Sequence, residues 1–128
     1  MKKELRLIEY IKDSYFEMIE EILECENINL DFKDSSGNSP LLMAYKKNNL
    51  EVMEMLLDEG ANINLEYNNN KTLLIIACED NNEEVVNLLL SYDDIDIDVQ
   101  DNDNKSAIDY AKENDNQNII KIIYNITY

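Results

Sequence analysis

Apolar residues recur mostly three or four positions apart along the chain, as in residues 16–23, 50–57 and 83–90. This spacing gathers apolar side chains on one side of a helix. The chain has 128 residues but only two Gly and one Pro, which disfavours a turn-rich β-sandwich. The pattern therefore predicts a soluble, mostly helical protein whose length fits one domain.

The chain also contains internal sequence repeats at a nearly constant spacing. Three segments superimpose without gaps and begin at residues 34, 67 and 101, so the period is 33 and then 34 residues. After a polar pair, each is followed by a second apolar run, over residues 50–57, 83–90 and 117–124. An upstream copy lies in residues 16–23, with residues 3–13 as its preceding helix. The sequence therefore predicts four helix pairs, the first and last acting as caps.

One copy carries a specific motif. It reads Ser39-Pro40-Leu41 with Ala44, then Leu56-Leu57, then Gly60-Ala61-Asn62-Ile63-Asn64. With the period of 33 residues, this motif resembles the ankyrin repeat. The other copies depart from the family pattern, because Leu73 and Ala107 replace its proline and Leu42, Ile75 and Asp109 replace its histidine.

The resemblance implies an all-α fold, an ankyrin-type α-solenoid of about four helix pairs with short hairpin fingers. Within one domain it implies an N-terminal capping helix pair (1–30), two repeats (31–63 and 64–97) and a degenerate C-terminal capping repeat (98–128). Ser39, Thr72 and Ser106 stand where a hydroxyl accepts the first backbone N–H groups of a helix. Where the family usually has glycine in its turns, the chain has Asn48, Asn70, Asn81 and Asn104, which we expect to adopt left-handed backbone angles.

Charge excludes several classes of partner. The chain has 28 acidic and 11 basic residues, a net charge of −17. Phosphate contacts need clustered Lys and Arg, so we expect neither nucleic acid nor an anionic membrane as partner. The acidity indicates either a basic partner or a self-repelling surface that stays soluble.

Candidate chemistry is sparse. The absence of histidine removes His-based triads and His metal sites, so we expect neither an enzyme nor a cofactor. An acidic run over residues 93–103 lacks the spacing of a calcium loop. Cys25 and Cys78 form no ligand cluster or disulfide; we expect Cys78 in the core and Cys25 half-exposed. With no secretory or membrane-spanning pattern, an intracellular, cytoplasmic monomer is expected.

The family resemblance implies that another protein binds the concave surface of finger tips and first-helix faces. By register, the positions in the first full copy are Lys33, Ser35, Ser36, Asn38, Lys46 and Lys47. The second copy supplies Glu66, Tyr67, Asn68, Asn69, Lys71, Glu79 and Asp80. The third supplies Gln100, Asn102, Asp103, Lys105, Glu113 and Asn114. Tyr67 replaces a finger aspartate and is expected to be partly exposed, with edge packing and partner contact both open.

These positions carry net charges of +3, −2 and −1 in the three copies, so the surface is neutral overall. Much of the acidity falls instead on the second helices and the first pair. The leading hypothesis is a protein-binding module that uses the concave face. The alternative is an acidic inhibitor or immunity-type protein that neutralises a basic enzyme or toxin.

Overall fold

The computed structural model describes residues 2–25 and 27–127 and divides the chain into two compact units, Met1–Asn62 and Ile63–Tyr128. The helices of unit 1 are α1 (Lys3–Lys12), α2 (Phe16–Leu23), α3 (Pro40–Lys46) and α4 (Leu50–Asp58). Those of unit 2 are α5 (Leu73–Glu79), α6 (Glu83–Leu90), α7 (Ala107–Glu113) and α8 (Gln117–Thr127). No strand occurs in residues 2–25 and 27–127, so the predicted all-α fold is confirmed.

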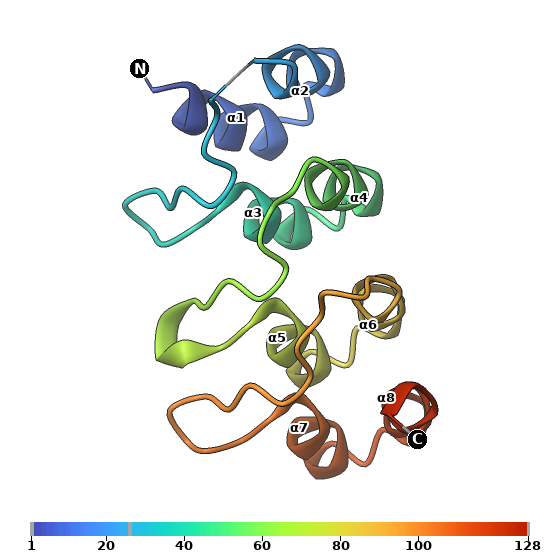
Figure 1. The fold of residues 1–128 in the computed structure, drawn as a ribbon. Helices are drawn as coiled ribbons and strands as arrows, with labels where there is room; N and C mark the ends of the chain where they lie inside the picture. Colours follow the sequence, from blue (N-terminus) through green and yellow to red (C-terminus); the bar gives the residue numbers. More distant parts are fainter. Residues whose placement is uncertain (1, 26, 128) are drawn as a thin grey trace. The chain divides into compact units, whose positions relative to one another are not determined.

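Unit 1 contains two helix pairs. Helix α1 packs against α2 and α3, and α3 packs against α4. In Figure 1, α1 and α3 lie on the side of the loop that precedes α3, and α2 and α4 lie on the other side. Leu7, Ile11, Ile19, Leu41 and Leu56 are among the fully buried side chains. We call α1 and α3 the inner helices of this unit and α2 and α4 its outer helices.

Unit 2 repeats this arrangement. Helix α5 packs against α6 and α7, while α8 packs against α6 and α7. Its inner helices are α5 and α7. Within this unit, the loops that precede α5 and α7 project to the same side (Figure 1). We call these loops, and the loop that precedes α3 in unit 1, the fingers. The short inner helix α5 is buried almost all round, with Leu73, Leu74 and Ile75 at 1 % exposure or less. Close packing on both neighbours explains its nearly continuous apolar sequence.

The helix starts follow the expected capping chemistry. The Leu42 N–H donates to Ser39 Oγ (3.1 Å), and the Ile75 N–H donates to Thr72 Oγ1 (3.3 Å), so both predicted caps are confirmed. At the start of α7, Ser106 forms a capping box in which its own N–H donates to the carboxylate of Asp109 (2.9 Å). Asp109, at the position of the family's histidine, is therefore the capping partner of Ser106.

Asparagine supplies the tight turns, as the sequence predicts. Asn48, Asn70, Asn81 and Asn104 have φ angles of 55°, 59°, 58° and 60°. This left-handed region disfavours most L-residues but is tolerated by asparagine. A repeat protein with only two glycines can therefore close its loops.

None of the helices in the described ranges is long and apolar enough to span a membrane.

Candidate protein-interaction faces

The inner face of unit 1 consists of the finger over residues 31–39 and the exposed sides of α1 and α3. Asp34 organises this finger, because its Oδ1 accepts the N–H groups of Ser36 and Asn38, both at 2.9 Å. The exposed predicted positions of this face are Lys33, Ser35, Ser36, Lys46 and Lys47. A finger that is already folded and displays hydroxyl and ammonium donors can bind a polar partner without losing the conformational entropy of a disordered loop.

Asn38 does not lie on the surface as the register predicts. It is only 7 % exposed, because its backbone closes the finger and its side chain turns toward the helix. Its Oδ1 accepts a hydrogen bond from Lys46 Nζ at 2.6 Å. Asn38 therefore positions Lys46, an exposed cation on α3.

Tyr67 also differs from expectation. It is 9 % exposed, so the expectation of partial exposure is wrong and the ring packs into the edge of the core. The finger closes without the usual aspartate, through a hydrogen bond from the Tyr67 N–H to the Lys71 carbonyl (2.8 Å). Left-handed angles at both Asn69 and Asn70 tighten the turn.

The second finger of unit 2 is built around Asp101. Its Oδ1 accepts the N–H groups of Asp103 (2.9 Å) and Lys105 (3.1 Å), and its Oδ2 accepts the hydroxyl of Tyr110 on α7. Burial alone would raise the pKa of Asp101, but these hydrogen bonds outweigh it and lower the pKa below its ordinary value. The same hydrogen bond and the burial of the ring raise the pKa of Tyr110. Asp101 is thus an ionised carboxylate that fixes the finger to its helix.

The charged positions of unit 2 pair with one another. Lys71 Nζ lies 2.8 Å from Glu79 Oε1, and Lys105 Nζ lies 2.9 Å from Glu113 Oε1. Both ammonium groups also lie over the Tyr110 ring, at 5.3 and 5.4 Å from its centroid. Each pair links a finger to the end of the inner helix that follows it. These four predicted contact residues therefore present neutralised pairs rather than isolated charges.

Asparagine side chains tie the two fingers of unit 2 together. Asn70 Nδ2 donates to Asn102 Oδ1 (2.8 Å), and the Asn102 N–H donates to the Asn69 carbonyl (2.9 Å). At the far end of the inner helices, Asn114 Nδ2 donates to the Glu79 carbonyl (3.1 Å). The remaining predicted positions of this unit, Glu66, Asn68, Asp80, Gln100 and Asp103, are exposed. The inner face of unit 2 is thus a cross-linked polar surface.

The outer helices of unit 1 form a second, acidic face. A groove of about 520 Å³ between α2 and α4 is lined by Glu20, Leu23, Glu24, Met55, Asp58 and Glu59. The four carboxylates are exposed, and Leu23 and Met55 are partly buried. This arrangement could accept a basic segment with an apolar residue.

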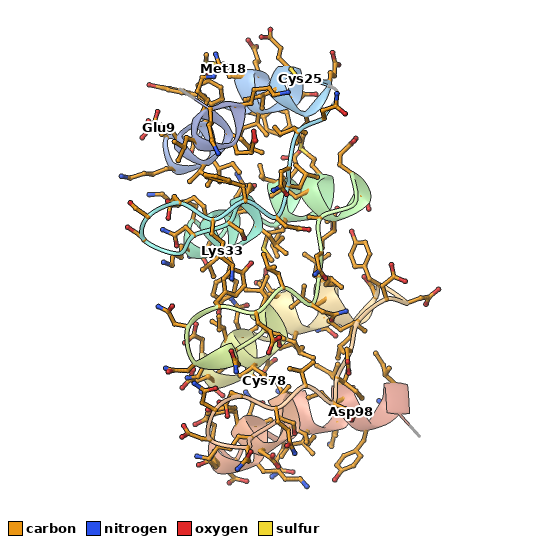
Figure 2. The ribbon with its side chains drawn as sticks, turned by 60° about the vertical axis from the view of Figure 1, so that its left-hand side comes forward. Glu9, Met18, Cys25, Lys33, Cys78 and Asp98 are labelled. Atoms are coloured by element: carbon orange, nitrogen blue, oxygen red, sulfur yellow. The ribbon has the colours of Figure 1, made fainter. Side chains whose placement is uncertain are left out.

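The two cysteines occupy different environments (Figure 2). Cys78 is fully buried in α5, and burial raises the pKa of its thiol to about 12. Cys25 is exposed just beyond the end of α2. The predicted burial of Cys78 is confirmed. Within the described ranges, no three Cys, Asp or Glu side chains are grouped so that they could hold a metal ion.

The sequence interpretation missed Tyr110 and Lys12. Tyr110 lies at the register of Met43 and Ile76, where a phenol hydroxyl can reach the finger aspartate, and that substitution is visible in the repeat alignment. Lys12 lies 34 residues before Lys46 and holds the same position on α1. Applying the register to the first helix pair would have found it.

Comparison with known families agrees with this architecture. The family model described as ankyrin repeats (3 copies) matches residues 6–67 and again residues 59–127. No curated protein matches the chain. Because the family matches cover nearly the whole sequence, the chain belongs to the ankyrin repeat family.

Proposed function

We propose that this protein is a protein-binding module whose inner faces, made of fingers and inner helices, contact the partner. Ankyrin repeats generally mediate protein–protein interaction and are typically non-catalytic. The observation that carries the proposal is the ordered finger of unit 1, where Asp34 holds the loop and Asn38 holds Lys46. Groups held in place before binding lose less conformational entropy on association.

A pair of charge-reversal variants tests the proposal. The full chain is immobilised, a captured partner is identified and purified, and its affinity is measured by calorimetry. Lys46→Glu with Lys47→Glu should weaken binding about tenfold or more, since two exposed cations become anions. Glu51→Lys with Glu54→Lys, on the exposed side of outer helix α4, is the matched control and should bind as the wild type does. If the inner-face variant binds the partner with unchanged affinity, the inner face is not the binding surface.

The acidic groove of unit 1 supports a second candidate function, inhibition of a basic enzyme or toxin. Glu20 and Glu24 on one side and Asp58 and Glu59 on the other would then meet cations of the target. Electrostatic steering predicts fast association that slows steeply with added salt. In this case Glu20→Lys with Glu24→Lys abolishes capture, whereas the Lys46 and Lys47 variant retains it. Association that does not respond to salt would count against the inhibitor.

A further inference from the structure

Unit 1 separates its charges between two sides. It contains seven of the eleven basic residues of the chain, namely Lys2, Lys3, Arg6, Lys12, Lys33, Lys46 and Lys47. All seven belong to α1, α3 and the segments beside them. The outer helices carry six carboxylates and no Lys or Arg. The same elements also hold Glu4, Glu9, Asp13, Asp31 and Asp34, so seven basic and five acidic residues give the inner side of this unit a net charge of +2, although the molecule is acidic overall.

Three of these cations occupy equivalent ends of neighbouring helices. Lys12 ends α1, Lys46 ends α3, and Lys47 follows directly. The turns beyond them match as well, because Ser14 and Asn48 both have positive φ angles, 62° and 55°. Helices α1 and α3 pack against each other, so the three ammonium groups project from one end of a packed pair.

All three lysines are exposed. Glu9 and Asp13 are exposed carboxylates at the same end of α1, so three positive and two negative charges leave the group net positive. Lys46 gives its hydrogen bond to the neutral amide of Asn38, so its charge is retained. We call Lys12, Lys46 and Lys47 the basic cluster.

Unit 2 shows the opposite arrangement at the same register. Glu79 and Glu113 stand where unit 1 has Lys46, and they neutralise Lys71 and Lys105. The repeat therefore has two alternatives at these positions, an internal Lys–Glu pair or an exposed lysine held by an amide. Only the second leaves a charge for a partner to neutralise.

We infer that the basic cluster binds an acidic segment of the partner protein; this rests on the proposed function of the inner face. Exposed Ser35 and Ser36 in the adjoining finger add hydroxyl donors for carboxylates. The net charge of −17 favours a short segment over a nucleic acid. At about 0.15 M salt the screening length is about 8 Å, so a short segment responds mainly to the nearby lysines. An extended polyanion would also meet the carboxylates of the outer helices.

The test is a selection of random twelve-residue peptides on the immobilised full chain at about 0.15 M salt. Recovered peptides should be enriched in Asp and Glu relative to the library. The triple variant Lys12→Gln, Lys46→Gln and Lys47→Gln should bind the recovered peptides about tenfold more weakly. The reason is that the exposed ion pairs between these lysines and the peptide carboxylates are lost. Lys121→Gln, on the exposed side of α8 and outside the inner faces, is the control and should change affinity less than about twofold. Far-UV circular dichroism checks that each variant is folded.

Other outcomes overturn the inference. Recovery of no peptide, or of peptides without acidic enrichment, contradicts it, while the capture experiment with Lys46→Glu and Lys47→Glu still decides the proposed function. Peptides that bind equally well after the Lys12, Lys46 and Lys47 substitutions contradict the inference as well. A fluorescein-labelled oligothymidylate is titrated in parallel. If it binds more tightly than the recovered peptides and is lost in the triple variant, the cluster is a nucleic-acid site instead.

Discussion

The hydroxyl of Tyr110 donates a hydrogen bond to the carboxylate of Asp101, joining inner helix α7 to the finger that precedes it. The two residues are only 8 % and 5 % exposed. Asp101 already accepts two backbone N–H groups of the finger, so one carboxylate connects the loop to the helix. In unit 1, Asp34 holds its finger in the same way, but Met43 occupies the position of Tyr110.

Removing this hydroxyl should destabilise the protein. Tyr110→Phe leaves one oxygen of a buried carboxylate without its donor, and we expect the free energy of unfolding to fall by about 1–3 kcal/mol. Urea denaturation followed by circular dichroism measures the change. Tyr15→Phe, on an exposed tyrosine of unit 1, is the control and should stay within about 0.5 kcal/mol of the wild type. An equal effect of the two substitutions would contradict the role given to Tyr110.

Acid should reduce the difference in the free energy of unfolding between the wild type and Tyr110→Phe. The pKa of Asp101 is lowered in the folded protein from an ordinary value of 3.8. The stabilisation it provides is therefore fully present above that ordinary value and is lost as pH falls through the lower folded pKa. Urea denaturation at pH 7 and in steps below pH 4 should show a constant difference that narrows only in the acid steps. If the difference in the free energy of unfolding is the same at every pH, the contribution of the Tyr110 hydrogen bond does not depend on the ionisation of Asp101.

The two thiols should react at different rates. Burial raises the pKa of Cys78 to about 12, so almost no thiolate is present near neutral pH, and the side chain is also inaccessible. Cys25 is exposed. Ellman's reagent should modify one thiol in the native protein and two in urea, and Cys25→Ser should abolish the native reaction. Two rapid native equivalents would place Cys78 in a more open environment.

Two adjacent asparagines should each lose stability on substitution by alanine, but a different residue should be tolerated at each position. Asn48 has a φ of 55°, whereas Asn49 caps α4 by accepting the Val52 N–H at 3.1 Å. Asn48→Gly should be tolerated and Asn48→Ala should cost about 1 kcal/mol, because only alanine is strained there. Asn49→Asp should be tolerated and Asn49→Ala should cost about 1 kcal/mol through loss of the cap. Thermal unfolding of the four variants decides this, and an equal loss in both alanine variants with no recovery by Gly or Asp would contradict it.

The features that the sequence predicts correctly are those decided within a few residues. A hydroxyl cap such as Ser39, or a left-handed asparagine such as Asn48, depends on the backbone next to it. The capping box of Ser106 and Asp109 has the same local origin, and its three-residue spacing could have been predicted.

Features that depend on how a finger folds over its helix were not predicted. The pairing of Lys71 with Glu79 joins residues eight positions apart, and the burial of Tyr67 depends on a finger that closes without its aspartate. Neither follows from local propensity. The division into two compact units likewise depends on the sum of many packing contacts.

The pairing in unit 2 can be transferred to unit 1 as a last test. Asn38 and Lys46 occupy the positions of Lys71 and Glu79, so Asn38→Lys with Lys46→Glu copies the internal pair. The long lysine stem can reach solvent from the buried position of Asn38, and an exposed pair contributes little, so stability should change by less than about 1 kcal/mol. Binding of an acidic peptide recovered in the selection should nevertheless fall. Lys46→Gln leaves the same net charge at the two positions, so calorimetry should find equal losses for the two variants. If the double variant binds as the wild type does, the charge of Lys46 does not recognise the peptide.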